Sequence, residues 1–477
     1  MIFSSIDFIF RFLPLFLIGY YMAPKNYKNL ILFIGSLIFY AWGDLSYLPL
    51  LLFSLLVNFI FGKLIAGHGQ PNQTEKNRKI FLWVTLAFNF GMLIFFKYTN
   101  FLIENLNALL SVFSAEIPAV RVSMPLGISF YTFQIAAYIV DVYRKDTKPA
   151  NNIVTLGTYL FMFPHLVSGP IFTYTDIAPE LRYRTVTMEN LEKGLKTFIL
   201  GLGAKSILAN PMGTLWAGMS RYGYESISTP YAWLGAYGYS FQIYFDFFGY
   251  SLMAMGLGTM LGITIPKNFN NPYISKSMGE FWRRWHMTLG QWFKKYIYFP
   301  LGGSRCSTPK MIRNTLIVWA FTGFWHGASW NFVLWGLLFF GFLMLERFWL
   351  GKYLERYPAL GHIYVCLLIP LTWVVFAMTD MSDLGAYFLR LFPFAGTPDF
   401  VTVKDFFGAL EDYWYLLIAC VFFSTEFPEK LYAKYKEKCG ENAILSYAEP
   451  AVLLVIFIGS MMMVRNSSDN PFLYFSF

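Results

Sequence analysis

The chain has 477 residues, of which 56% are hydrophobic, 21% aromatic and 14% charged. A soluble domain carries about 25% charged residues, so this composition excludes an ordinary soluble enzyme and favours a protein that lies in the lipid bilayer. The formal net charge of +9 is explained in so apolar a chain by basic cytoplasmic loops, and we therefore expect no nucleic-acid partner.

Apolar runs long enough to cross about 30 Å of hydrocarbon recur along the whole chain. They predict an all-α polytopic membrane protein with about 11–12 transmembrane helices and no long soluble domain. The first run lacks the basic start and the small-residue cleavage site of a signal peptide, so we expect it to be retained. The predicted spans are about 6–23, 29–43, 48–66, 80–97, 125–141, 190–217, 231–262, 311–328, 330–349, 361–379, 411–425 and 450–464.

Lysine and arginine residues gather in alternate loops between the first of these spans. Lys25 and Lys28 lie in one loop, and further basic residues lie within 63–79 and 144–148, whereas the intervening loop at 43–47 has none. Cytoplasmic loops are enriched in basic residues. The pattern therefore predicts a multi-pass protein of the cytoplasmic (inner) membrane with its N-terminus outside the cytoplasm.

Segment 158–172 is apolar but is interrupted by Pro164, Gly169 and Pro170. Non-helical backbone at membrane depth is tolerated only where protein buries it or where it lines a cavity. We therefore predict that this segment is re-entrant and does not form a straight span.

Segment 280–303 has the pattern of one amphipathic helix that lies at the membrane surface. On a helical wheel with about 100° per residue, large apolar side chains share one face and basic side chains share another. The apolar face holds Trp282, Trp285, Leu289, Trp292, Phe293 and Tyr296, and the basic face holds Arg283, Arg284, Lys294 and Lys295.

That basic face belongs to a larger cluster between residues 276 and 313, where eight lysine or arginine residues accompany one acid, Glu280. Such a cluster can bind anionic lipid head groups, or it can attract the phosphates of an acyl donor that enters from the cytoplasm. Charge alone does not separate these interpretations, and both stay open. Under the second, the residues that steer the donor phosphates are Arg283, Arg284, Lys294 and Lys295.

The run FTGFWHGASWNFVLWG places His326 among aromatic, aliphatic and small residues with no charged side chain. An ionisable residue at membrane depth is costly and marks a candidate functional site. Gly323 and Gly327 permit close helix packing, and the small residues up to Ser329 leave room beside the ring. An imidazole with an unperturbed pKa of about 6.5 can take a proton from a hydroxyl. The alternative is a histidine that only forms hydrogen bonds between helices.

Two further features add to this candidate site. Trp325 and Trp330 can wall the site, and His286 lies at the margin of the apolar face of the amphipathic helix.

The chain has only five histidines, none of them paired at the spacing of three or four residues that a helical metal site needs. The four cysteines show no C-x-x-C spacing, so we expect neither a metal site nor a redox motif.

The chain resembles the membrane-bound O-acyltransferase family over nearly its full length, and within that family the bacterial branch that includes alginate O-acetylation proteins. The resemblance rests on motifs that occur in order. They are FSSIDFIFRFLPLF at 3–16, PLGISFYTFQ at 125–134, FPHLVSGPI at 163–171, QIYFDFFGYS at 242–251, FNNPYISKSMGEFWRRWHMTLGQWFKKYIYFPLGG at 269–303, GFWHGASWNFVLWG at 323–336 and NPFLYFSF at 470–477.

The resemblance implies a single membrane domain over 1–477, with N-terminal helices in 1–123, a core with both histidines in 124–350 and C-terminal helices in 351–477. It implies a central funnel or tunnel that meets at the catalytic histidine. His326 matches that histidine and His286 matches its usual companion. The substrate or tunnel lining then includes Trp325, Trp285, Ser329, Asp246 and Gln134. Phe248 and Leu252 depart from the alginate-type motif and leave Asp246 as its only carboxylate.

The function that the resemblance implies is O-acyl transfer without a permanently bound cofactor. Acetyl-CoA would supply an acetyl group that passes outward to a polysaccharide or to a secreted or membrane-anchored partner acetyltransferase, alongside the polysaccharide machinery. One alternative is D-alanyl transfer from an acyl carrier protein to teichoic acid. A transporter or channel is the alternative from another class, but it would require several intramembrane charges or inverted repeats, and the sequence has neither apart from Asp246 and the histidines.

Overall fold

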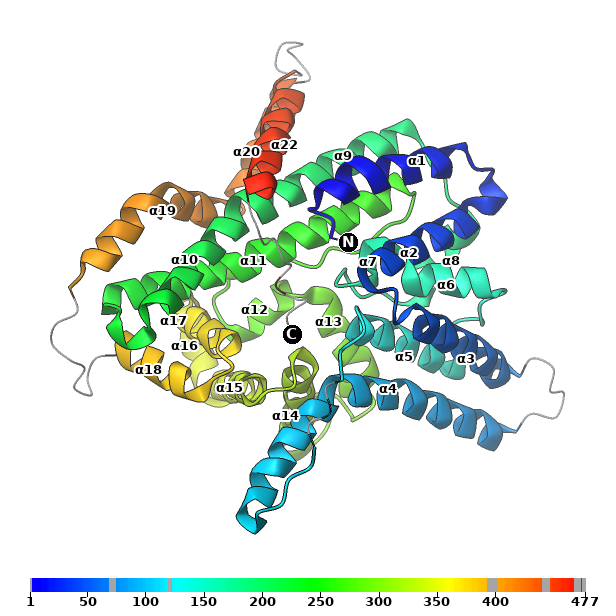
Figure 1. Cartoon of the computed structure of the whole chain (residues 1–477), viewed down its shortest axis with the longest axis horizontal. Coiled ribbons are helices and arrows are strands. Elements are labelled where there is room, and N and C mark those ends of the chain that lie inside the picture. Colours follow the sequence, from blue (N-terminus) through cyan, green and yellow to red (C-terminus); the bar gives the residue numbers. More distant parts are fainter. Residues whose placement is uncertain are drawn as a thin grey trace. The chain divides into compact units, whose positions relative to one another are not determined.

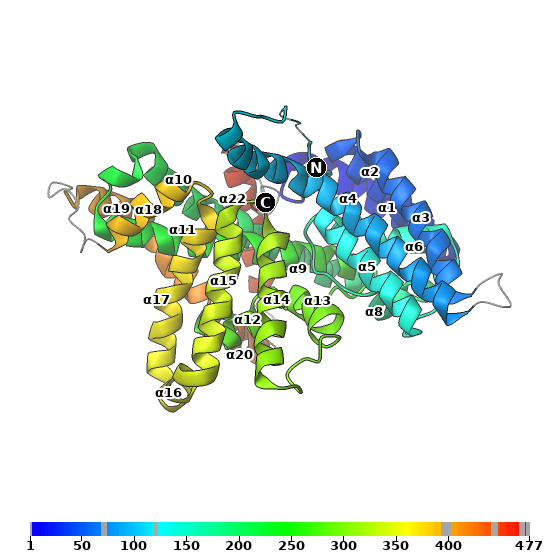
Figure 2. The same ribbon diagram turned by 90° about the horizontal axis from the view of Figure 1, so that it is seen from below.

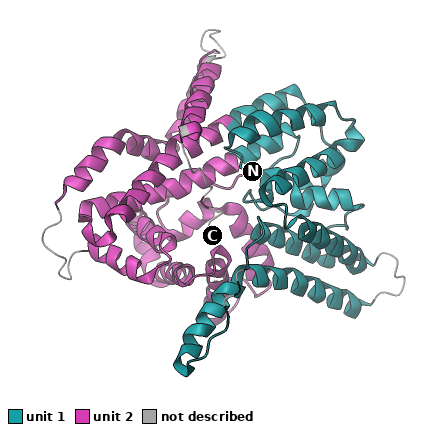
Figure 3. Ribbon diagram, viewed as in Figure 1, with its two compact units in different colours: residues 1–198, 253–266 teal, residues 199–252, 267–477 magenta. Residues whose placement is uncertain are grey.

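The computed structural model describes residues 2–67, 74–118, 120, 122–392, 402–439, 447–466 and 473. These described residues form helices and no strand, which confirms the predicted all-α fold. They divide into two compact units, coloured separately in Figure 3: unit 1 comprises residues 1–198 and 253–266, and unit 2 comprises residues 199–252 and 267–477. Of the closing motif at 470–477, only Leu473 lies within the described residues.

Unit 1 is a bundle of the N-terminal helices (Figure 1), in which α5 packs against α3 and α4, and α2 packs against α1 and α6. The side-chain amides of Asn58 and Asn89, both fully buried, donate to each other's oxygens over 3.0 and 2.8 Å and so join α3 to α4. Such bonds tie helices together where no water competes. Its helices are η1 Phe8–Phe12, α1 Leu13–Met22, η2 Lys25–Tyr27, α2 Lys28–Asp44, α3 Leu48–Ala66, α4 Glu75–Leu110, η3 Ser111–Phe113, α5 Ile128–Arg144, α6 Ile153–Phe161, α7 Phe163–Leu166, α8 Tyr174–Arg182 and most of α9 Met188–Gly203.

Unit 2 contains both histidines of interest. Its helices are η4 Ala204–Ala209, α10 Asn210–Tyr222, η5 Tyr224–Ser226, most of α11 Thr229–Met260, η6 Pro272–Ile274, α12 Met278–Arg284, α13 Met287–Phe293, η7 Lys294–Tyr298, α14 Thr308–His326, α15 Trp330–Leu345, η8 Glu346–Leu350, α16 Gly351–Arg356, α17 Pro358–Ala377, α18 Met381–Leu391, α19 Lys404–Phe423, α20 Phe427–Cys439 and α22 Ala448–Asn466. Figure 2 shows α14, α15 and α17 running side by side, and α15 packs against both of the others.

Among the described residues, six helices are long and apolar enough to cross a membrane. They cover Leu48–Ala66, Glu75–Phe113, Trp330–Arg356, Pro358–Ala377, Lys404–Phe423 and Ala448–Arg465. The other predicted spans are helices that are shorter or less apolar, such as α2 and α5.

The predicted interruption of segment 158–172 is confirmed. α6 ends at Phe161, α7 covers only Phe163–Leu166, and the chain then continues without helix to Thr173. The whole stretch is buried inside unit 1. The protein therefore encloses this broken backbone, as its position in an apolar chain requires.

The prediction of one continuous amphipathic helix over 280–303 is wrong. α12 ends at Arg284, His286 adopts a left-handed conformation with φ of 43°, and α13 begins at Met287. A helical wheel assumes unbroken helix and cannot reveal such a break. The predicted burial nevertheless holds, because Trp285, Leu289 and Trp292 are buried whereas Arg283 is exposed.

Glycines let α14 and α15 approach backbone to backbone. A Cβ atom on Gly323 would overlap the Phe332 carbonyl oxygen, and one on Gly336 would lie 2.6 Å from the Trp319 carbonyl oxygen. The close packing predicted from the small residues around His326 is therefore confirmed. It fixes the end of α14, where the histidine lies.

Gly323→Ala is expected to lower the stability of the protein by about 1–3 kcal/mol, because the added methyl group overlaps backbone that cannot rotate away. Gly341→Ala on α15 is the matched control, since nothing lies within 4 Å of the Cβ position there. Thermal unfolding of the purified protein measures both changes. Equal melting temperatures for the two variants would contradict the packing argument.

Candidate active site

His326 is the last residue of α14 and lies in an aromatic cage. The side chain is 4% exposed, and its ring makes edge contacts with Trp325, Trp335 and Phe376 at centroid distances of 4.9, 5.0 and 5.2 Å. Trp330, which we expected as a second wall, is 57% exposed. Trp335 of α15 and Phe376 of α17 form the wall instead. Such a cage fixes the ring and keeps water away from it.

His286 lies between α12 and α13 and is 1% exposed. Its ring makes an edge contact with Phe247 of α11 at 4.7 Å and approaches the Trp325 indole at 6.1 Å. Trp325 therefore contacts both imidazoles. The structure brings together the two histidines that the sequence singled out, although forty residues separate them.

The left-handed backbone of His286 is unusual for a residue with a Cβ atom. Two backbone hydrogen bonds from the preceding loop bracket it: Asn270 N–H donates to the Arg284 carbonyl, and Met287 N–H donates to the Asn268 carbonyl, both over 2.9 Å. Because strained conformations persist only where their surroundings enforce them, and gather at functional sites, this geometry supports a functional role for His286.

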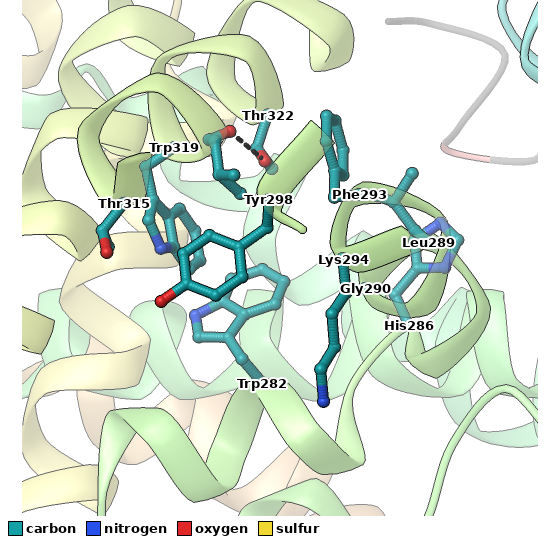
Figure 4. Close-up of a pocket in the computed structure, with 11 residues that line it drawn as sticks. Trp282, His286, Leu289, Gly290, Phe293, Lys294, Tyr298, Thr315, Trp319 and Thr322 are labelled. Carbon is teal, nitrogen blue, oxygen red and sulfur yellow. Dashed lines mark hydrogen bonds between the residues drawn. The ribbon is translucent and has the colours of Figure 1, made fainter. Parts of the chain in front are cut away.

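A cavity of about 250 Å³ opens beside His286. In Figure 4, His286, Leu289 and Phe293 lie on one side of it, and Thr315 and Trp319 of α14 lie on the other, together with Tyr298 of η7. The walls are mainly aromatic and aliphatic. Their polar groups are those of His286, Lys294, Tyr298, Thr315 and Thr322. The lining residues are Trp282, His286, Leu289, Gly290, Phe293, Lys294, Tyr298, Thr315, Val318, Trp319 and Thr322.

The four basic residues predicted to steer phosphates differ in their surroundings. Lys294 is exposed and lines the cavity. Arg284 forms an ion pair of 2.9 Å with Glu280 and donates to the Asn270 carbonyl, so it holds the local fold. Arg283 is exposed, and the ammonium of Lys295 lies 5.0 Å from the Tyr296 ring. Lys294 is therefore the best placed of the four to meet a ligand in the cavity.

Two of the predicted lining residues, Trp285 and Ser329, lie outside the cavity beside His286. Trp285 packs into an aromatic core, 4.8 Å from Trp373 and 5.0 Å from Phe269, and does not line the cavity. Ser329 directly precedes α15 and is partly exposed. Their role in lining a tunnel stays a prediction.

Asp246 and Gln134 have partners of their own. Asp246 in unit 2 forms a buried ion pair of 2.7 Å with Lys205 and accepts a hydrogen bond of 2.8 Å from the Leu473 backbone N–H. Gln134 in unit 1 donates to Nδ1 of His165, whose Nε2 donates to the Tyr159 carbonyl. These contacts give both residues structural functions, and their role as tunnel lining is a prediction as before.

Sequence reasoning missed the partner of His286, which is Asn268 at 3.2 Å from Nδ1. The asparagine lies directly before the motif that begins at Phe269, which is the signal that could have drawn attention to it.

Within the described part of the chain, no three His, Cys, Asp or Glu side chains lie close enough together to hold a metal ion. The chemistry that the side chains around the cavity can supply is proton transfer by imidazole.

Comparisons with known proteins place these features in context. Residues 37–379 match the model of the membrane-bound O-acyltransferase family. The chain is 33% identical to a probable alginate O-acetylase of Azotobacter vinelandii over the full length of both chains. It is 33% identical to a peptidoglycan O-acetyltransferase of Helicobacter pylori, covering 80% of this chain and 78% of the other. It is 31% identical to a teichoic acid D-alanyltransferase of Streptococcus thermophilus, covering 48% of this chain and 58% of the other.

Proposed function

The chain belongs to the membrane-bound O-acyltransferase family and is a multi-pass membrane acyltransferase, and from that premise we propose a specific reaction. The protein takes acetyl from acetyl-CoA on the cytoplasmic side and passes it to a hydroxyl outside the cytoplasm, on a polysaccharide or on a partner transferase. It acts in the cytoplasmic membrane with its N-terminus outside. The basic loops of the first spans support this orientation.

The observation that carries the proposal is the buried, aromatic-caged imidazole of His326. As the acceptor hydroxyl oxygen attacks the thioester carbonyl carbon, the neutral imidazole takes the hydroxyl proton and a C–O bond forms. The tetrahedral intermediate then collapses, the C–S bond breaks, and the imidazolium returns the proton to the leaving thiolate. The products are an ester and a free thiol, with no net gain or loss of protons. General base catalysis of this kind contributes about 10²–10⁴-fold in rate.

Acetyl transfer is favoured over D-alanyl transfer by the extent of the similarity. The acetylating relatives from Azotobacter and Helicobacter align with all and with 80% of this chain, whereas the D-alanylating relative aligns with 48%. An acyl carrier protein as donor partner is the second candidate. Supplying the purified protein with acetyl-CoA or with D-alanyl carrier protein, and measuring ester formation from each, tests the choice directly.

The cavity beside His286 supports entry of the donor there. Its apolar walls suit the thioester end of the donor, and the ammonium of Lys294 suits a phosphate. Lipid head groups are the competing ligands of the basic cluster. A substitution at Lys294 separates the two, because a donor contact alters donor kinetics and a lipid contact does not.

Lys294→Gln is expected to raise the KM for acetyl-CoA about fivefold while kcat changes little, because one phosphate-facing cation contributes about 1 kcal/mol near the membrane surface. Raised ionic strength should raise the KM of the unmodified protein more than that of the variant. Lys310→Gln is the control, since Lys310 belongs to the same basic cluster and does not line the cavity. An unchanged KM for Lys294→Gln would contradict donor entry through this cavity.

A further inference from the structure

Asn268 lies at the centre of a buried set of hydrogen bonds around His286. The asparagine is 1% exposed. Its Oδ1 accepts from the backbone N–H of Thr288 over 3.3 Å and from the Thr288 hydroxyl over 2.9 Å, and it lies 3.2 Å from Nδ1 of His286. Its Nδ2 donates to the Ser251 hydroxyl over 3.4 Å. All these residues belong to unit 2.

The chemistry of these partners determines which atom of the asparagine faces the histidine. A backbone N–H can only donate, so the side-chain atom that Thr288 contacts must be the amide oxygen and not the nitrogen. An amide oxygen can only accept. The same oxygen faces Nδ1 of His286, and Nδ1 must therefore carry a hydrogen and donate it.

The charge state of the ring completes the assignment. Burial lowers the pKa of the His286 imidazole to about 3, so the ring is neutral near pH 7. A neutral imidazole carries one hydrogen on its two nitrogens. With that hydrogen on Nδ1, the lone pair lies on Nε2.

We propose that Asn268 is a positioning residue that holds His286 in the neutral tautomer with its hydrogen on Nδ1, so that Nε2 acts only as a hydrogen-bond acceptor. The left-handed backbone at His286 and the two backbone hydrogen bonds on either side of it help to hold the ring in the same position. His286 lines the cavity, so a ligand that reaches Nε2 from there must bring an O–H or N–H group to it. Two groups of the proposed substrates meet this requirement: the hydroxyl that receives the acyl group, and an amide N–H in the arm of the donor that carries the thioester. This inference rests on the proposed acyl transfer for its functional meaning but not for its structural test.

The direct test is nuclear magnetic resonance of the full-length protein labelled with carbon-13 and nitrogen-15 in histidine only. The chain has five histidines, and His286→Gln identifies the His286 signal by its disappearance. At pH 7 without substrate, the expected signal is that of a neutral ring with hydrogen on Nδ1. A ring with hydrogen on Nε2, or a doubly protonated ring, would overturn the proposal.

Variants of Asn268 then test its part in the assignment. Asn268→Leu removes the amide oxygen that accepts the hydrogen bond from Nδ1 of His286. We therefore expect the His286 signal to move to that of the other tautomer or of a mixture, with kcat falling more than KM rises. Asn268→Asp restores an oxygen opposite Nδ1, so the hydrogen should return to Nδ1. Asn270→Ala, two residues away at an exposed position, should leave the His286 signal unchanged, because alanine keeps the backbone N–H that bonds to Arg284. An unchanged tautomer in Asn268→Leu would refute the role of Asn268.

The outcomes also separate this inference from the proposed function. A protein that shows the Nδ1 tautomer but transfers no acyl group would refute the proposed reaction alone. A protein that transfers acetyl with the other tautomer would refute this inference alone. If Asn268→Leu fails to fold, the spectrum of the unmodified protein still decides the tautomer.

Discussion

His326→Ala should reduce O-acyl transfer by about 10²–10⁴-fold, which is the contribution of a general base and acid, while the protein still inserts into the membrane and folds. The physical reason is that the caged imidazole is the group that would move the proton between hydroxyl and thiolate. Alanine leaves the backbone at the end of α14 unchanged. The loss should therefore appear in kcat and not in the amount of protein.

The measurement is the acetyl content of the surface polymer in cells that carry equal amounts of each variant. His362→Gln is the matched control, because it removes a partly exposed histidine of α17 at another position. Transfer by His326→Ala at more than half of the unmodified rate would remove His326 from the catalytic role.

His286→Ala is expected to have the second largest effect, a severe loss of turnover. The ring lies against the same Trp325 indole as His326 and lines the cavity, so its removal should misplace the reacting groups. Residues that act as a unit give non-additive losses. The variant that lacks both histidines should thus be little worse than His326→Ala alone.

Initial rates of the two single variants and of the double variant, measured with saturating donor, decide this point. Losses that multiply would show that the histidines act independently, and the shared site around Trp325 would then have no functional meaning. Binding of a non-reactive donor analogue to each variant checks that the loss lies in turnover.

Much of the local architecture was predictable from residue patterns. The burial of Trp285, Leu289 and Trp292 followed from helical periodicity, and the break in 158–172 followed from proline and glycine. The break at His286 was not predictable, because a left-handed histidine has no composition signal and a wheel assumes continuous helix. Its cause lies in the loop at 268–270, whose bonds to both sides of the break are tertiary contacts.

The candidate site also has features that the sequence predicted and features that it did not. The apolar setting of His326 and the motif around His286 pointed to both residues. Of the ring neighbours of His326, Trp335 lies within the same motif, whereas Phe376 comes from α17, fifty residues later. No spacing rule connects residues as far apart in sequence as His326 and Phe376. The ion pair that occupies Asp246 depends likewise on Lys205, forty-one residues earlier. Such contacts arise from helix packing and are visible only in three dimensions.

The central claim is that acetyl crosses the membrane through this protein by way of His326. The most direct measurement uses proteoliposomes in which the basic cluster faces the medium, with radiolabelled acetyl-CoA outside and alginate and peptidoglycan fragments enclosed. The account predicts labelled, base-labile ester on the enclosed fragments with the unmodified protein, and almost none with His326→Ala. Enclosed ester formed at equal rates by both proteins, or labelled ester found only outside the vesicles, would contradict it.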